Sequence, residues 1–314
     1  MTETETDGVW PPQPQSPAKP GPQGIAAARP AGMRPAEAPR SYEQAEVLLR
    51  QTFDEVKHQH DTPDGKRFIS THWNRYVNII QALPALPEGA AVLEIGASIM
   101  SSVLKRRLRA DAHAAYHELE KEWPARFAED GVKGTPVELM RDPLPYPDRT
   151  FDLILFDEVM EHFPLSPDFF LKQVFKILKP DGQLILSVPN FAIFERRWDM
   201  LLGRNPQDVM DDRYIYYAHH REPVMAECLD LVRRCGGQVL EHRWTDYGPP
   251  AGAGGNAWNI LRYLRHLEFH KIAHVLFPAM RAYLFIRAVR HPAADLDNWT
   301  AAPPLAATTE YARK

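Results

Sequence analysis

Residues 151–162 read FDLILFDEVMEH, and this stretch indicates the fold more directly than any other in the chain. The apolar run from Phe151 to Phe156 is typical of a short buried strand, and we expect the acidic residues after it to lead straight into a helix. In parallel sheets, ligands bind beyond the carboxyl ends of the strands. The polar residues that close this stretch are therefore candidates for chemistry: Asp157, Glu158, Glu161 and His162.

The composition is that of a globular protein with one good core. The chain has 314 residues, of which 44% are hydrophobic and 25% charged, and the formal net charge of -4 gives no reason to expect a nucleic-acid partner. Two cysteines, Cys228 and Cys235, argue against a disulfide framework and for a reducing compartment. No apolar run is long enough to span a membrane, and the acidic first residues do not form a secretory signal. We therefore expect a cytoplasmic protein.

Composition also divides the chain into parts. Residues 1–40 hold nine of the 29 prolines and almost no large apolar side chains, which predicts a disordered leader, and residues 292–314 are predicted to be a disordered tail for the same reason. Residues 41–88 contain two predicted helices, 41–60 with Ser41 as N-cap and 71–83. Residues 89–291 form the main domain, with inserts at 191–221 and 248–280.

From Ala90 onward, short apolar runs alternate with helical stretches. The predicted strands are 91–95, 114–117, 151–156, 183–188, 238–244 and 281–289, and the predicted helices are 101–109, 120–127, 167–178 and 223–235. Such alternation predicts a parallel sheet with right-handed crossovers. We expect an α/β fold: a Rossmann-like, seven-stranded, mostly parallel sheet with helices on both faces, an N-terminal helical segment, and an α-helical insert before the last strand.

The segment VLEIGAS, residues 92–98, is a buried strand that runs into a glycine turn. A dinucleotide site uses three glycines to approach a pyrophosphate, whereas only Gly96 is present, so NAD and FAD are disfavoured. A ligand with a ribose and no phosphate does not need the missing glycines. Glu118 follows the second predicted strand, where an acidic side chain can accept both ribose hydroxyls, although it could equally begin a solvated helix. A single glycine after a strand is also compatible with a simple turn.

Four segments, in order and at compatible spacing, resemble the class I S-adenosylmethionine-dependent methyltransferases of the bacterial type 11 group. They are VLEIGAS at 92–98, LPYPDRTFD at 144–152, EVMEH at 158–162, and LKPDGQL at 178–184 running to Val188-Pro189-Asn190. The resemblance covers residues 90–244, about half of the chain. It implies S-adenosylmethionine as the cofactor and methyl transfer as the activity.

The resemblance also implies roles for particular residues. Glu94 and Gly96 would line the methionine end of the cofactor, Glu118 would hold the ribose, and Glu138, or else Asp142, would lie near the adenine. The full set of cofactor-binding residues expected on this basis is Glu94, Gly96, Ala97, Ser98, Glu118, Glu138, Asp142 and Asp157. Where many relatives carry further glycines, this chain has Ser98 and Met100.

The cluster of Glu158, Glu161 and His162 supports three interpretations. On a helix these positions share a face. His162 could be a general base, because the ordinary pKa of histidine lies close to neutral pH. The set could instead hold a divalent ion, as in small-RNA 2′-O-methyltransferases, which it resembles and which add a later histidine that His219 or His220 could supply. Finally, the cluster could be structural, since methyl transfer needs little beyond positioning.

Two segments are candidates for binding the acceptor or a partner. Residues 191–221 start beyond a strand end and are rich in aromatic residues and histidine, including His220, a second candidate for catalysis; the same residues could equally pack as a lid. Residues 259–280 have an amphipathic, basic pattern, which predicts a helix docked on the core or on a second subunit, or one lying on a membrane surface.

These observations favour a methyltransferase that uses S-adenosylmethionine on an oxygen of a small molecule or a saccharide precursor. A metal-assisted form of this reaction is a further hypothesis. The opposing hypothesis is a noncatalytic protein of the same fold that regulates a partner, which the short glycine loop favours. An NAD-dependent oxidoreductase fits less well, because the loop holds a single glycine.

Overall fold

The fold is known from a computed structural model, which describes residues 40–60, 62–117, 120–139, 141–164, 166–207, 219–246, 276–296 and 299. The predicted leader before Arg40 lies outside the described residues. So do residues 208–218 of the first predicted insert, residues 247–275 of the second, and the predicted tail after Leu296 apart from Trp299.

The described strands form a single seven-stranded sheet in the order β3-β2-β1-β4-β5-β7-β6. The strand bounds are β1 Ala91–Ile95, β2 Asp111–Tyr116, β3 Lys133–Pro136, β4 Phe151–Asp157, β5 Leu178–Pro189, β6 Gly237–Thr245 and β7 Tyr283–Arg290. Strands β1 to β5 pair in parallel, and β7 is antiparallel to both of its neighbours. The predicted Rossmann-like, mostly parallel sheet is therefore confirmed.

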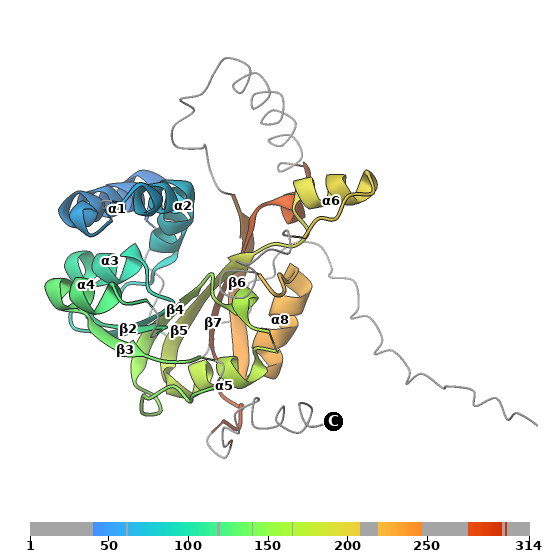
Figure 1. The fold of residues 1–314 in the computed structure, drawn as a ribbon. Coiled ribbons are helices and arrows are strands. Elements are labelled where there is room, and N and C mark those ends of the chain that lie inside the picture. The colour runs from blue at the N-terminus through green and yellow to red at the C-terminus, as the bar shows by residue number, and fades with distance from the viewer. Residues whose placement is uncertain are drawn as a thin grey trace, which may run out of the picture.

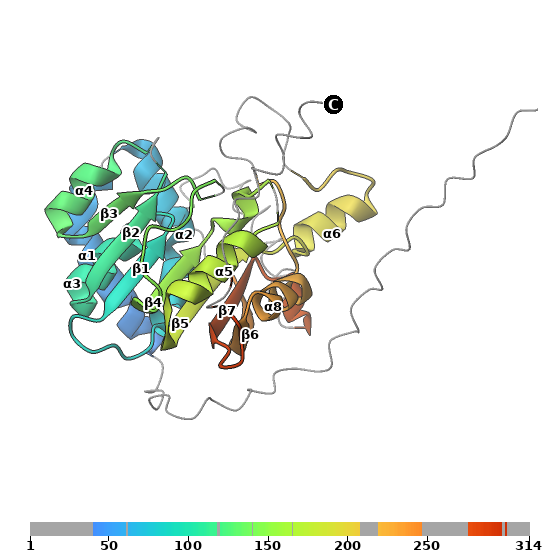
Figure 2. The same cartoon turned by 90° about the horizontal axis from the view of Figure 1, so that it is seen from below.

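Helices cover both faces of the sheet (Figures 1 and 2). The helix bounds are α1 Tyr42–Val56, α2 Pro63–Ala82, α3 Ile99–Leu108, α4 Trp123–Asp130, α5 Asp168–Ile177, α6 Phe194–Leu201 and α8 Met225–Arg234, with short 3-10 helices η1 Lys57–His60, η2 Met160–His162 and η3 Pro278–Met280. Helices α1 to α4 lie on one face, and α5 and α8 lie on the other. Among the described helices, none is long and apolar enough to cross a bilayer.

Strand β4 separates the two hydrophobic cores because its side chains alternate between the faces of the sheet. Leu153 and Leu155 belong to the core beneath α1 to α4, whereas Ile154 and Phe156 belong to the core beneath α5 and α8. Leu296, 4% exposed, also packs into the second core, so the packed region continues past the predicted start of the tail at Pro292.

Several predicted elements differ from the structure at their ends. Helix α2 begins at Pro63 after the N-cap Thr62, earlier than the predicted residue 71, because proline fits the first turn of a helix. Helix α3 begins at Ile99, since the Ser98 hydroxyl accepts from the Met100 N–H and caps it. Strand β3 was not predicted: its sequence KGTP has no apolar run, and it lies at the sheet edge.

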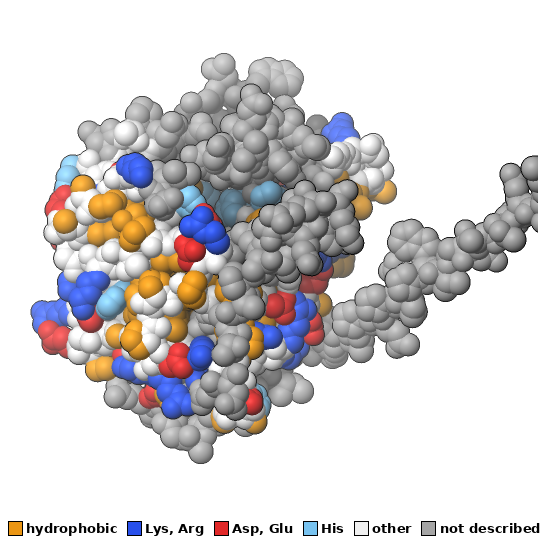
Figure 3. All heavy atoms as spheres, turned by 60° about the horizontal axis from the view of Figure 1, so that its bottom comes forward, with side chains coloured by type: hydrophobic (Ala, Val, Ile, Leu, Met, Phe, Trp, Pro, Cys, Tyr) orange, Lys and Arg blue, Asp and Glu red, His pale blue; other side chains and the backbone are white. Residues whose placement is uncertain are grey.

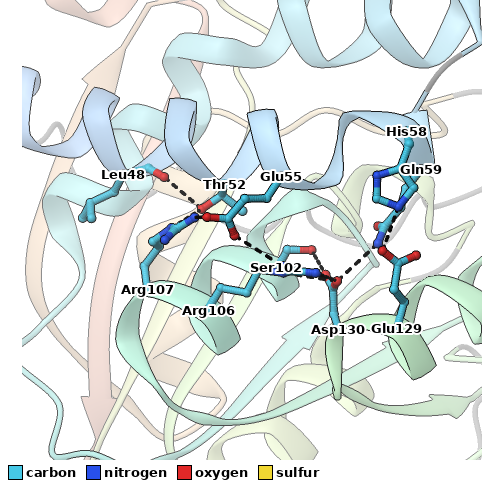
Figure 4. A network of polar contacts seen from close by, with 10 residues as sticks. All are labelled: Leu48, Thr52, Glu55, His58, Gln59, Ser102, Arg106, Arg107, Glu129 and Asp130. Carbon is cyan, nitrogen blue, oxygen red and sulfur yellow. Dashed lines mark hydrogen bonds and ion pairs between the residues drawn. The ribbon is translucent and has the colours of Figure 1, made fainter.

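A buried carboxylate docks the N-terminal helices onto the sheet domain (Figure 4). Asp130, at the end of α4, accepts hydrogen bonds from Arg106 and Ser102 of α3 and, at 3.2 Å, from Gln59 of η1. Nearby, Arg107 of α3 pairs with Glu55 of α1. Because these contacts join α1 and η1 to α3 and α4, the N-terminal segment is fixed to the domain.

Candidate active site

The turn after β1 lies close to Val159, the second residue after the end of β4. Gly96 has φ +81, a conformation that favours glycine, and a Cβ atom there would lie 2.3 Å from Val159 Cγ2. Its N–H donates to the Ala115 carbonyl at the end of β2. The carboxyl ends of three parallel strands are thus brought together at one glycine.

Glu94 and Ser98 form a buried hydrogen-bonded group beside this turn. The Glu94 side chain is almost fully buried and accepts hydrogen bonds from the hydroxyls of Ser98 and Ser101. Burial raises the pKa of Glu94 to about 8, against the opposing effect of those hydrogen bonds. Ala97, between Gly96 and Ser98, packs against the core beneath α1 to α4.

The residues expected near the ribose and adenine lie at the ends of β2 and β3. Glu138 follows β3, and its Oε2 is 2.8 Å from His117 Nε2, which follows β2. Asp142 is more exposed, and hydrogen bonds from Arg141 lower its pKa. Glu118 lies outside the described residues. Glu138 is therefore held beside the ends of β2 and β3, whereas Asp142 pairs with its chain neighbour Arg141.

The chain does not continue from β4 into an α-helix, so the prediction that Glu158, Glu161 and His162 share a helix face is wrong. Glu158 has φ +55, which reverses the backbone, and only a short 3-10 helix, η2, follows. The Glu158 N–H donates to the Ser187 carbonyl of β5 at 2.9 Å. The Glu158 carboxylate pairs with Arg75 of α2, at 3.2 Å, as does that of Asp157.

Glu161 is the most enclosed carboxylate of the group. It is 0% exposed, and neither of its side-chain oxygens has a hydrogen-bond partner among the described residues. Burial, reinforced by the neighbouring Glu158, holds its pKa well above the ordinary range. Its Oε1 lies 4.0 Å from His162 Nε2 and 3.9 Å from His219 Nε2. The site therefore contains a buried acid that faces two imidazoles.

His219 is held in place by a second carboxylate. Its Nδ1 lies 2.6 Å from Glu222 Oε1, and Glu222 is in turn bound by both terminal nitrogens of Arg196 from α6. The rings of His162 and His219 meet edge to face at 4.9 Å. An imidazole whose Nδ1 is engaged by a carboxylate presents its Nε2 to the site, which suits it to bind a metal or a proton.

Two cavities open beside this cluster. The larger, of about 450 Å³, is lined by Phe68, His72, Arg75, Glu158, Glu161, His162, Pro189, Asn190, Ile193, Arg196, His219, Glu222, Ala282 and Tyr283. A cavity of about 350 Å³ shares Arg196, His219 and Glu222 with it, and His220 lines this second space. Figure 3 shows histidine side chains gathered in a hollow on one face of the molecule.

The same cluster offers a set of metal ligands. Ligand atoms of Glu161, His162 and His219 all lie within 4.8 Å of one another. Glu158, the third metal-ligand candidate expected from the sequence, is not part of this group and is paired with Arg75. A later histidine does approach, and it is His219 that contacts Glu161.

The arginines and one glutamate of this site were not predicted: Arg75, Arg196 and Glu222. Arg75 had a visible signal, because it is a charged residue inside the apolar pattern of its helix, next to Tyr76 and Val77. Arg196 and Glu222 gave none, since they are separated in sequence and meet only through the fold.

Comparison with known proteins defines the class. The methyltransferase-domain family matches residues 66–222, half of the chain. The chain belongs to this family and is a class I S-adenosylmethionine-dependent methyltransferase, as the sequence motifs implied, and S-adenosylmethionine is the cofactor of this class. None of the curated proteins matches the sequence significantly.

One solved structure supports the fold, and two others are more distantly similar. A chain of the complex between the Haloferax volcanii Trm112 methyltransferase activator and its candidate methyltransferase is 18% identical, with a TM-score of 0.52 over 78% of this chain and 99% of that chain. A methyltransferase of Thermotoga maritima is 18% identical, with a TM-score of 0.47 over 77% of this chain and 99% of that one. Phosphoethanolamine N-methyltransferase 2 of Haemonchus contortus is 12% identical, with a TM-score of 0.47 over 80% of this chain and 57% of that chain.

Proposed function

We propose that this protein methylates a hydroxyl oxygen of a small molecule or saccharide precursor, with S-adenosylmethionine as donor. The observation that carries the proposal is the polar cavity of about 450 Å³, where His162, His219 and the buried Glu161 lie together beyond the end of β4. Val159, the residue after the cavity-lining Glu158, lies close to Gly96 in the turn that the family resemblance assigns to the cofactor, which supports a cavity on the acceptor side of that turn.

The chemistry of the residues around that turn fits the cofactor. Carboxylates and hydroxyls suit an ammonium group and ribose hydroxyls, and the chain has no glycine-rich phosphate loop there. Glu94, Gly96, Ala97 and Ser98 would hold the methionine end, while Glu138 would lie toward the adenine. When bound, S-adenosylmethionine supplies an electrophilic methyl group.

The residues of the cavity would then serve the acceptor. A hydroxyl in the cavity can donate its proton to His162, which makes the oxygen a better nucleophile. The cavity holds the acceptor in a fixed orientation and excludes bulk water, which lowers the barrier through positioning. His220 lies in the neighbouring cavity and would contact an acceptor long enough to enter it.

Calorimetry and a transfer assay test the proposal. The protein should bind S-adenosylmethionine, and a donor with a labelled methyl group should label an acceptor from a panel of phenols, sugars and sugar nucleotides. His162→Gln should lower kcat by about 100-fold or more, the range of general-base catalysis. His58→Gln, an exposed histidine on η1, is the matched control and should keep full activity. Absence of cofactor binding would instead favour the noncatalytic hypothesis.

One observation favours a second candidate, a metal-assisted form of the same reaction. The oxygens of Glu161 have no hydrogen-bond partner among the described residues, although a buried carboxylate ordinarily needs one, and two imidazole nitrogens approach it. Glu222 would support His219 as a metal ligand in the usual second role of a carboxylate. A divalent ion there could bind the acceptor oxygen and lower its pKa.

Chelation separates the two candidates. If a metal is required, dialysis against EDTA should abolish turnover, and Mg²⁺ or Mn²⁺ should restore it. Under the metal hypothesis His219→Ala should also abolish the binding of Mn²⁺ measured by electron paramagnetic resonance. Full turnover by the chelated protein leaves His162 as the base.

A further inference from the structure

Helix α2 inserts a charged side chain into the interior of the site. Arg75 lies on the apolar side of the helix between Asn74 and Tyr76, and its side chain is 5% exposed. Burying a cation is costly unless it is paired, so a fully buried guanidinium indicates partners that compensate for lost hydration. Because α2 precedes the sheet in sequence, this residue does not belong to the strand-end motifs that define the fold.

The partners of Arg75 are the two carboxylates at the end of β4. Its Nε lies 3.2 Å from Asp157 Oδ2, and its Nη1 lies 3.2 Å from Glu158 Oε2. The guanidinium also lies over the rings of Tyr76 and Tyr283, at 5.0 and 5.7 Å from their centroids. Arg75 therefore joins α2, β4 and β7 at one point. Its hydrogen bonds go to His72 and to the Tyr76 hydroxyl. A lysine could not reproduce this arrangement, because its ammonium lacks the planar surface and the several donors of a guanidinium.

The backbone of Glu158, whose carboxylate pairs with Arg75, is strained. A residue other than glycine in the left-handed region costs about 1–2 kcal/mol, and such strain persists only where the surroundings hold it. At Glu158 the surroundings are the ion pair with Arg75 and the hydrogen bond to Ser187. The next residues of the chain are Val159, which contacts Gly96, and then Glu161 and His162. The direction of these side chains thus depends on the reversal at Glu158.

Arg75 also pairs with two of the three carboxylates that gather at this strand end. Asp157 and Glu158 pair with it directly, whereas no ion pair joins it to Glu161; Asp157 and Glu161 are buried, and the Glu158 side chain is 14% exposed. Without the guanidinium, two more anionic groups would be left without a charged partner in a poorly solvated region. They would then move apart, admit water or take up protons, and each of these changes alters the cavity wall.

We infer that Arg75 is a positioning residue of the methyl-transfer site: its ion pairs with Asp157 and Glu158 orient Glu161 and His162 toward the acceptor cavity. Helix α2 is then a part of the active site and not only a cover over the sheet. This inference rests on the proposed function, since it assigns Arg75 a part in the same reaction.

The test compares Arg75→Lys and Arg75→Met with a matched control in the full-length protein. Arg107→Met removes another arginine that binds the N-terminal helices, through Glu55, but does not line the cavity. Melting temperature, affinity for S-adenosylmethionine, kcat and KM are measured for each. Arg75→Met should lose about 100-fold in kcat, the scale of a misplacement of about 1 Å, while cofactor affinity changes by less than about threefold. Arg107→Met should lower the melting temperature and keep kcat.

Rescue distinguishes positioning from mere stability. Millimolar ethylguanidinium should raise the kcat of Arg75→Ala at least tenfold, because it can occupy the space between the two carboxylates. It should leave the kcat of Arg107→Met unchanged. Arg75→Lys should have a lower kcat than Arg75→Ala in the presence of ethylguanidinium. The inference is overturned if Arg75→Met keeps kcat within twofold, or if Arg75→Ala loses activity only in proportion to its folded fraction and is not rescued.

A second readout does not depend on turnover. Imidazole nitrogen resonances of His162 and His219, assigned with His162→Gln and His219→Gln, should shift in Arg75→Met and stay unchanged in Arg107→Met. If the wild-type protein methylates nothing, the proposed function fails while these resonances still test the positioning. Unmoved resonances in Arg75→Met would overturn the inference alone.

Discussion

Replacement of Glu94 by glutamine tests the electrostatics of the cofactor pocket through the pH dependence of stability. Burial raises the pKa of Glu94 from 4.5 to about 8. The folded protein therefore holds this proton more tightly than the unfolded chain does, so its contribution to the free energy of unfolding falls as pH rises from 4.5 toward 8. One pKa unit corresponds to about 1.4 kcal/mol, so the whole window corresponds to at most about 5 kcal/mol.

Glutamine removes this titration with little change in shape. The hydroxyls of Ser98 and Ser101 can each donate or accept, so they can still pair with an amide. We expect the unfolding free energy of Glu94→Gln relative to the wild type to rise by about 2 kcal/mol or more between pH 6 and pH 8.5. The other buried carboxyls of the site titrate in both proteins, so they cancel in this difference.

Urea denaturation at a series of pH values measures the effect. Glu55→Gln serves as the control, because Glu55 is exposed and its hydrogen bond to Arg107 lowers its pKa, which leaves it ionised throughout this range. The difference in unfolding free energy between Glu55→Gln and the wild type should stay constant between pH 6 and pH 8.5. A flat difference for Glu94→Gln as well would refute the assignment of Glu94 as a buried acid that carries its proton near neutral pH.

The same substitution should change cofactor binding. S-adenosylmethionine is a cation, so its binding should favour the ionised form of Glu94 and release a proton near pH 7. Calorimetry in two buffers of different ionisation enthalpy measures that release. Glu94→Gln should release fewer protons on binding, because it lacks this carboxyl, and should bind the cofactor at least tenfold more weakly. Equal proton release by both proteins would show that Glu94 does not contact the charged end of the cofactor.

Two further substitutions test the packing around the site. Gly96→Ala should cost about 2–4 kcal/mol of stability and weaken cofactor binding, because the new Cβ would lie 2.3 Å from Val159 in a left-handed turn. An alanine variant as stable as the wild type in urea would contradict the close contact. Asp130→Ala should lower the free energy of unfolding by about 2–3 kcal/mol, because it removes the carboxylate that Arg106, Ser102 and Gln59 share, and should leave cofactor affinity unchanged. A loss below about 0.5 kcal/mol in the same assay would show that this network does not hold the N-terminal helices.

Much of the fold could be predicted because its strands are continuous apolar runs buried on both faces. Strands β1 and β4 are the best examples, and β4 was predicted to within one residue of its end. Strand β3 could not be found, since its sequence lacks such a run and pairing with β2 alone defines it. The start of α2 was hidden because Pro63 and Gly65 are typical of a turn as well as of a helix start.

The site was only partly predictable, for a different reason. The residues along one stretch, 158–162, were found from their position after a strand, but the left-handed backbone at Glu158 was not, because no glycine stands there to indicate it and its partner Arg75 comes from a distant helix. His219 and Glu222 likewise reach the cluster through tertiary structure. Local pattern identifies which end of the sheet is polar, whereas long-range ion pairs decide which side chains meet there.

A crystal structure of the protein with S-adenosylhomocysteine bound tests the central claim most directly. The expected result has the ligand at the carboxyl ends of β1 and β2, with its amino acid end beside Glu94 and Gly96 and its sulfur facing the cavity formed by Glu161, His162 and His219. A ligand bound elsewhere, or one whose sulfur points away from that cavity, would contradict the assignment of the methyl-transfer site.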